Sequence, residues 1–311
     1  MTIERHHASL ERLLDPKEPL RWLAEDVTTT ALGPLEGPLW WQEENCLYFS
    51  DVRGARRLRW SEKKGVEVVA TDTRMGNGLT RDPQGRLLAC ELAGRRVSRW
   101  EADGSHTVVA REFAGRRLNM PNDIVVKSDG SIWFTDPYTP MPYVHRTEFD
   151  QVFDGIYRLE GDLSGMSMVI RDIVHPNGLC FSPDEKILYA NDFGRNTIRA
   201  YDVKPDGSLD MSTDRLFCDM HNDARPGKPD GMKCDVEGNV YCGGSGGLWI
   251  MDPAGRHLGT IAHGQDKTTN LAFGGPDWKT LFFTTHTKLG AVRVKVPGVP
   301  VPCSQCTVRG T

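Results

Sequence analysis

The chain has 311 residues and a nearly balanced charge, with 38 Lys and Arg residues against 42 Asp and Glu residues. A nucleic-acid binder usually carries a basic excess or a basic stripe, so we expect no nucleic-acid partner. No apolar run approaches the roughly 18 residues that span a bilayer, and residues 1–20 lack the apolar core of a secretory signal. We therefore expect a cytoplasmic protein without a membrane partner, and the sequence leaves the oligomeric state open.

The first 20 residues form an N-terminal extension, in which a short helix is predicted at about residues 6–15. Leu10, Leu13 and Leu14 would lie on one face of this helix. The next stretch, from Trp22 to Leu32, is rich in β-branched residues. We expect it to add a strand to the last repeating unit and so to close a ring without an exposed sheet edge.

A repeating unit occupies residues 21–298. Each copy begins with an acidic or amide residue, usually followed by glycine, and continues through an apolar run, a turn rich in Asp, Gly and Pro, and a second strand. The six leading residues are Glu36, Asn77, Asn122, Asn177, Asp230 and Asn270. A period of about 40 to 50 residues is typical of four-stranded propeller blades. The sequence therefore predicts an all-β fold, a six-bladed β-propeller with a short N-terminal helix.

Two segments do not follow the repeat. The connection at residues 137–154 is long and rich in Pro and charge, and long irregular loops often serve as lids over a site. Residues 299–311 form a C-terminal tail that contains Cys303 and Cys306. A zinc site would need further ligands near this pair, and none follow it, so we expect a loose surface tail. The other cysteines lie in apolar runs and should pack as free thiols.

The six leading residues would meet at one place in the fold. The first strand of each propeller blade lines the central axis, so residues at the same repeat position face the same channel. A ring of carboxylates and amides is costly to bury unless a partner satisfies its oxygens. A hard divalent cation would do so, because it prefers oxygen ligands. The alternative stays open on spacing alone, because Asn-Gly and Asp-Gly are also common turn dipeptides.

Several motifs taken together resemble those of the gluconolactonase/regucalcin (SMP-30-like) family of metal-dependent lactonases. One is Leu35-Glu36-Gly37-Pro38-Leu39-Trp40, and the likeness extends over roughly residues 30–295. The other resembling segments are residues 118–123, 133–137, 175–179, 181–184 and 228–232.

The resemblance implies one divalent cation bound by Glu36, Asn122, Asn177 and Asp230. In such proteins the ion is often Ca²⁺, with Zn²⁺, Mg²⁺ or Mn²⁺ as substitutes. It also implies hydrolysis of a small lactone, such as the sugar lactone gluconolactone, with Asp230 as metal ligand and general base. Asn122 would also contact the substrate.

Two further residues are candidates for substrate binding. Asn119 lies just before Asn122, and His145 lies on the long 137–154 connection. Both could reach the rim of an axial site and contact an oxygen-rich substrate.

Two other functions are compatible with the same pattern. A phosphotriesterase-type hydrolase would use the same metal site on a different ester. A non-catalytic propeller would serve only as a binding platform, since one fold hosts many functions. No Gly-x-Ser-x-Gly motif is present in the sequence, which argues against a serine hydrolase of that type.

Overall fold

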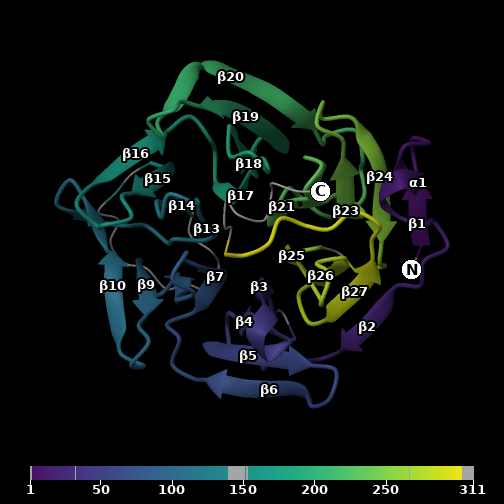
Figure 1. Cartoon of the computed structure of the whole chain (residues 1–311), viewed down its shortest axis with the longest axis horizontal. Coiled ribbons are helices and arrows are strands. Elements are labelled where there is room, and N and C mark those ends of the chain that lie inside the picture. Colours follow the sequence, from purple (N-terminus) through teal and green to yellow (C-terminus); the bar gives the residue numbers. More distant parts are fainter. Residues whose placement is uncertain (1, 32, 139–150, 152, 266, 303–311) are drawn as a thin grey trace.

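The computed structural model describes residues 2–31, 33–138, 151, 153–265 and 267–302. Six antiparallel sheets stand around a central axis, and each successive segment of the chain builds the next sheet of the ring (Figure 1). The predicted six-bladed β-propeller is confirmed. In every blade the first strand of the repeat is innermost, as the placement of the leading residues requires.

The strands of each blade are given from the axis outward. Blade 1 contains β3 (Leu35–Trp41), β4 (Cys46–Asp51), β5 (Arg56–Ser61) and β6 (Gly65–Ala70), with the short helix η1 (Gln42–Glu44) after β3. Blade 2 contains β7 (Gly76–Arg81), β8 (Leu87–Glu91), β9 (Arg96–Trp100) and β10 (His106–Ala110). A small hairpin, β11 (Glu112–Phe113) and β12 (Arg116–Arg117), leads into blade 3. Blade 3 contains β13 (Ile124–Val126), β14 (Ile132–Asp136), β15 (Gly155–Leu159) and β16 (Met166–Ile170).

The second half of the ring follows the same plan. Blade 4 contains β17 (Pro176–Phe181), β18 (Ile187–Asp192), β19 (Thr197–Val203) and β20 (Leu209–Asp219). Blade 5 contains β21 (Met232–Cys234), β22 (Val240–Gly244), β23 (Gly247–Met251) and β24 (His257–Ala262). Blade 6 contains β25 (Asn270–Gly274), β26 (Thr280–Thr284) and β27 (Leu289–Arg293).

The N-terminal segment supplies the outermost strands of two blades. Strand β2 (Arg21–Ala24) pairs with β27 and completes blade 6, which confirms that a segment before the first repeat closes the ring. This strand is shorter than the predicted stretch, because the chain turns at Asp26, whose φ is 52°. Strand β1 (Thr2–Arg5) pairs with β24 and gives blade 5 a fifth strand. Each sheet edge covered in this way is protected from pairing with another chain.

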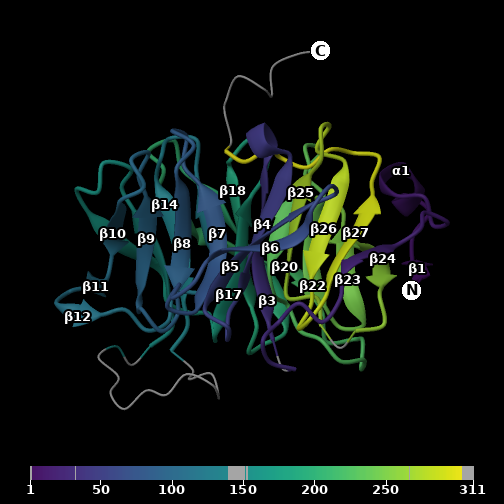
Figure 2. The ribbon, with the colours of Figure 1, turned by 90° about the horizontal axis from the view of Figure 1, so that it is seen from below.

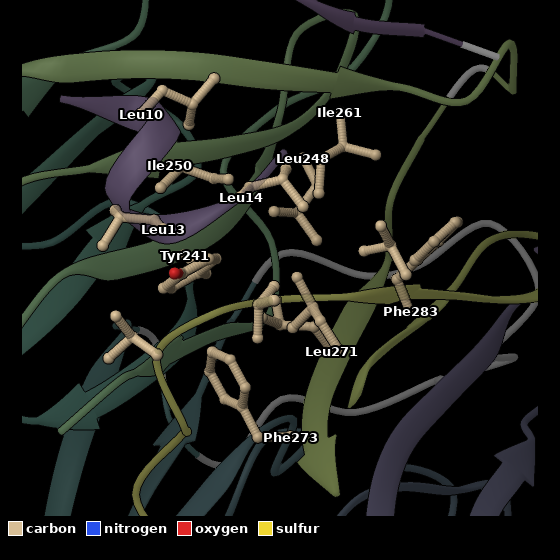
Figure 3. Packing of buried hydrophobic residues seen from close by; sticks show 14 of the residues in the cluster. Leu10, Leu13, Leu14, Tyr241, Leu248, Ile250, Ile261, Leu271, Phe273 and Phe283 are labelled. Atoms are coloured by element: carbon tan, nitrogen blue, oxygen red, sulfur yellow. The ribbon is translucent and has the colours of Figure 1, made fainter. Parts of the chain in front are cut away.

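The predicted N-terminal helix is present as a single turn, α1 (Leu10–Leu13). It ends at Leu14, whose φ of −150° and ψ of 139° are those of extended backbone. Leu10, Leu13 and Leu14 are fully buried in a cluster that includes Ile250 and Phe273 (Figure 3). The helix therefore packs into the apolar layer between blades 5 and 6 rather than lying free on the surface.

The hydrophobic core is divided among the interfaces between adjacent blades. Each pair of neighbouring blades encloses its own cluster of buried side chains. The cluster between blades 1 and 2 is small and contains only four buried residues, Leu39, Leu79, Leu87 and Ala89. The partly buried side chains of Trp41, Tyr48, Trp100 and Val301 pack against it.

Six cysteines within the described residues are buried free thiols, as predicted from their apolar surroundings. Cys303 and Cys306 lie outside the described residues. Among the helices that the structure describes, none has the length and apolar character of a membrane span.

Candidate metal centre and active site

The six leading residues lie where the innermost strands begin. Glu36, Asn77 and Asn177 are the second residues of β3, β7 and β17. Asn270 begins β25, and the other two leading residues lie just before β13 and β21. All six are between 2% and 8% exposed, so the predicted polar ring is a buried one.

In three blades a local irregularity of the innermost strand lies beside the leading residue. The register between the first two strands shifts after Glu36 in blade 1, and again around Asn77 in blade 2 and Asn177 in blade 4. Bulges of this kind re-aim side chains and are common beside functional sites. In these three blades the leading polar residue is thus placed by a break in the ladder, whereas Asn270 pairs regularly with Thr284.

The glycine that follows the leading residue allows neighbouring blades to approach closely at the axis. A Cβ atom on any of these glycines would lie less than 3 Å from the next blade's leading residue or its neighbour. The contacts run from Gly37 to Asn77, from Gly78 to Asn122 and Asp123, from Gly178 to Asp230, and from Gly231 to Asn270. The repeated x-Gly pattern is therefore a packing requirement of the axis in addition to a turn signal.

Two carboxylates predicted to bind a metal influence each other across the axis. Burial raises the pKa of Glu36 well above its ordinary value, and the nearby charge of Asp230 raises it further. Burial also raises the Asp230 pKa, while Lys267 and the Gly231 amide act in the opposite direction. Glu36 Oε2 accepts hydrogen bonds from Asn270 Nδ2 and from the Gly37 amide, both at 3.0 Å. A positive charge between the two carboxylates would relieve this arrangement.

A third axial carboxylate, Asp123, was not among the predicted site residues. It is 2% exposed, and its charge raises the pKa values of both Glu36 and Asp230. Burial raises its own pKa, against the opposing influence of Lys233. The sequence did carry a signal, because Asp123 stands where most other copies of the repeat have glycine.

Several buried oxygens at the axis have no hydrogen-bond donor among the described residues. They are Asn77 Oδ1, Asp123 Oδ2 and Asn177 Oδ1. An unpaired buried oxygen is costly, and an oxygen-preferring divalent cation is a partner that would satisfy such a set. Within the described residues no three His, Cys, Asp or Glu side chains group closely enough to hold a metal alone. The donor set therefore fits a cation only when amide oxygens join the carboxylates, as the predicted ligands Glu36, Asn177 and Asp230 do.

The backbone fixes Asn122 at the ring. Its amide donates to the Thr135 carbonyl at 2.8 Å, and its carbonyl accepts from the Gly78 amide at 2.9 Å. The structure thus places this predicted ligand beside blades 2 and 3, with its side chain 3% exposed.

Of the two other residues predicted to bind substrate, the structure describes Asn119 but not His145. Asn119 is completely buried, and its Nδ2 donates to the Phe153 carbonyl at 2.9 Å. Its backbone amide donates to Asp136 Oδ2 at 2.8 Å, so the residue holds the base of the long connection against β14. His145 and most of the 137–154 connection lie outside the described residues.

Residues of the connection between β24 and β25 lie close to Asp230. His263 Nε2 and Thr268 Oγ1 are 2.6 Å apart, and Thr268 lies next to the Gly243 backbone, which also contacts Asp230. The same loop carries Lys267, whose charge lowers the Asp230 pKa. The effect of Lys267 on Asp230 could not be predicted from the sequence, because the two residues come close together only in the folded ring.

The axial channel is apolar toward the other ends of the innermost strands. A cavity of about 80 Å³ is lined there by all six blades, through residues that include Leu39, Leu79, Val126, Phe181, Cys234 and Phe273. Residues 299–301 also line it, and Figures 1 and 2 show the C-terminal segment crossing this face of the ring. The ring of buried acidic and amide side chains thus lies at the end of the channel where the innermost strands begin.

Comparison with known proteins finds relatives that include gluconolactonases and regucalcins. A family model described as the SMP-30/Gluconolactonase/LRE-like region matches residues 34–287, which include all six leading residues. The gluconolactonase of Zymomonas mobilis is 26% identical over 95% of this chain and 87% of that protein. Regucalcin of Xenopus laevis is 32% identical over 80% of this chain and 82% of its own length. The solved structure of a gluconolactonase from Xanthomonas campestris superposes with a TM-score of 0.85 at 32% identity, covering 94% and 95% of the two chains.

Proposed function

Because the chain belongs to the SMP-30/gluconolactonase/LRE-like family, we propose that it is a hydrolase that opens a small sugar lactone, such as gluconolactone, at the axial ring. One observation carries the proposal. Glu36 and Asp230 are buried at the axis beside Asn177, whose side-chain oxygen has no donor among the described residues. A metal-assisted hydrolase needs such a concentration of oxygen ligands to hold its cation, and a purely structural axis does not.

The residues that would hold a divalent cation are Glu36, Asn177 and Asp230, with Asn122 as a fourth ligand or close neighbour. Ca²⁺ suits this all-oxygen set best, with Zn²⁺, Mg²⁺ or Mn²⁺ as substitutes. When bound, the cation supplies polarisation of the lactone carbonyl and stabilisation of the charge that develops on its oxygen.

Asp230 is proposed as the general base. Its Oδ1 accepts the Gly231 amide hydrogen at 3.1 Å, which orients the carboxylate. Asp230 takes a proton from a water whose oxygen forms a bond to the carbonyl carbon. The ring carbon–oxygen bond then breaks, and the proton passes to the departing alkoxide. The product is the open-chain hydroxy acid.

The substrate would be oriented by side chains around the ring. Asn122 is proposed to donate to a lactone oxygen, because its backbone is fixed by Thr135 and Gly78 and its side chain is thereby pre-positioned. His145 is proposed as a rim contact. Asn119 is proposed to support the connection that carries His145, through its bond to Phe153.

The test is a gluconolactone hydrolysis assay corrected for spontaneous ring opening. Dialysis against a chelator should abolish enzyme-dependent turnover, and added Ca²⁺ or another divalent ion should restore it. Asp230→Asn should lower kcat by about 100-fold or more while part of the metal binding remains. Asp252→Asn is a matched control, since Asp252 accepts backbone hydrogens in a turn after β23. Full turnover in Asp230→Asn would refute its role as the base.

A substrate panel separates the proposal from its alternatives. A sugar lactone, an aromatic lactone and a fluorophosphate would be compared at equal metal loading. Faster hydrolysis of the fluorophosphate would favour a phosphotriesterase. Absence of metal-dependent turnover on all three would favour a binding platform.

A further inference from the structure

A cleft of about 560 Å³ lies between blades 1 and 2, away from the axial ring. Its lining includes Trp41, Tyr48, Arg57, Leu87 and Trp100. The turn after β7 and the turn after β9 form part of its rim. Strand β7 begins beside the axial ring, so these turns lie at the opposite end of the blade. Cavities that hold small molecules are typically about 300–1,000 Å³ and are lined mainly by apolar and aromatic groups.

Two buried arginines at this interface can be compared directly. Each guanidinium lies 4.0 Å from the centre of a tryptophan ring, Arg81 over Trp41 and Arg57 over Trp100. Arg81 is satisfied, because it donates to both oxygens of Glu43 at 2.8 and 3.1 Å and to the Gly85 carbonyl. The side chain of Arg57 belongs to a residue that is only 7% exposed, and its buried Nε has no hydrogen-bond partner among the described residues.

Glu91 and the carboxylates that line the cleft are already engaged by other side chains. Glu91, whose charge acts on Arg57, accepts from Arg96 at 2.6 Å. Glu44, at the cleft, accepts from the Tyr48 hydroxyl at 2.9 Å.

Glu101 also lines the cleft, and it accepts from Arg99 at 2.8 Å and from Arg86 at 3.1 Å. The acidic side chains at the cleft are therefore held by partners of their own. Arg57 is left as a cation without a described anion.

Leaving a buried guanidinium unpaired is costly. Burial lowers the Arg57 pKa to about 10, so the group is still charged at neutral pH. The face of Trp100 offsets part of the cost, but a ring face cannot replace a hydrogen-bond acceptor. A carboxylate is the acceptor that matches the planar guanidinium, because two parallel N–H···O bonds can form.

We propose that this cleft is a second ligand site, which binds a small organic carboxylate with a flat ring. The carboxylate pairs with Arg57, and the ring lies against the surface formed by Trp41, Tyr48 and Leu87. The site is separate from the axial ring and does not depend on the function proposed there.

The test is calorimetric titration with benzoate, on protein dialysed free of divalent ions so that no axial metal can bind the probe. Wild-type protein should bind benzoate saturably, and neutral benzamide should bind at least about tenfold more weakly. Arg57→Met should lose at least about tenfold in benzoate affinity and keep or raise its Tm, since an unpaired buried charge is removed. Arg57→Lys should retain intermediate affinity.

Arg293→Met is the control for net charge, because Arg293 is an exposed residue of blade 6 paired with Asp277. It should bind benzoate as wild type does. Equal affinity in Arg57→Met, equal affinity of benzamide and benzoate, or no saturable binding would overturn the proposal. Should Arg57→Met fail to fold, the comparison of the two probes on wild-type protein decides the question.

Discussion

Gly178 lies directly against the backbone of Asp230, so closely that a Cβ atom on Gly178 would be 2.2 Å from the Asp230 carbonyl oxygen. The first residue belongs to blade 4 and the second to blade 5, and their neighbours include the proposed ligand Asn177. A methyl group on residue 178 would therefore collide with the backbone of one proposed metal ligand, Asp230, next to another, Asn177.

Gly178→Ala should therefore damage both the fold and the site. The added methyl must push blades 4 and 5 apart, and overpacking of this kind costs about 1–3 kcal/mol of unfolding free energy. Gly165→Ala is the control, because a Cβ there meets nothing within 4 Å. Urea unfolding should show a lowered midpoint for Gly178→Ala and an unchanged or slightly raised one for Gly165→Ala. Equal midpoints would contradict the close approach.

Glu36→Gln should stabilise the metal-free protein. The substitution removes a buried carboxyl group whose pKa is raised by burial and by the charge of Asp230. The side-chain oxygen of Gln can still accept hydrogen bonds from Asn270 Nδ2 and the Gly37 amide. Ca²⁺ at 100 times its dissociation constant should stabilise wild type by about 2.7 kcal/mol, and the variant by much less. Thermal unfolding with and without Ca²⁺ measures both effects. A lower Tm for the metal-free variant would argue against charge repulsion at the axis.

The buried His263 should make stability fall in mild acid. Burial lowers its pKa to about 4 from the ordinary 6.5, so the unfolded chain takes up a proton that the folded chain excludes. Stability from the neutral ring is complete above about pH 6.5 and is lost as the pH falls toward 4, by up to about 3 kcal/mol. His263→Gln lacks this titration. The difference in unfolding free energy between wild type and variant should narrow between pH 7 and pH 4.5, and a constant difference would contradict the prediction.

Leu10→Ala should destabilise the propeller although Leu10 lies outside the repeats. Its side chain is fully buried in the layer between blades 5 and 6. Truncation of a buried leucine typically costs about 2–5 kcal/mol. Leu216→Ala, on the outer strand β20 where Leu216 is 55% exposed, should cost much less. Denaturant unfolding of the two variants compares them, and similar midpoints would show that the N-terminal helix is dispensable.

The six-bladed fold and the leading residues could be predicted because their signals are local and repeated. Alternating apolar runs and turn dipeptides give the strands, and repetition in phase gives the blades. Asp123 was not predicted because it is the second residue of its repeat, where four of the other five copies have glycine. The close approach of Gly78, on which an added Cβ would lie 2.7 Å from Asp123 Oδ1, and the effect of Asp123 on the pKa values of Glu36 and Asp230 show that this carboxylate belongs to the axis.

The strands β2 and β1, which complete blades 6 and 5, also show which features a sequence pattern cannot predict. The sequence predicted a closing strand, because a propeller edge must be covered, but not that β1 pairs with β24. Pairing between segments some 250 residues apart leaves no local pattern in either of them. The sequence likewise could not predict that Arg57 lacks an anionic partner, because this depends on nearby carboxylates that bind other side chains in the folded protein.

The sequence by itself determined the architecture and the chemical type of the axial residues, because strand periodicity and repeated polar positions are properties of nearby residues. Tertiary structure alone decided which oxygens are left without donors, which carboxylates raise one another's pKa, and which arginine is unpaired. These properties depend on distance and burial among blades, and both are fixed only when the ring has closed.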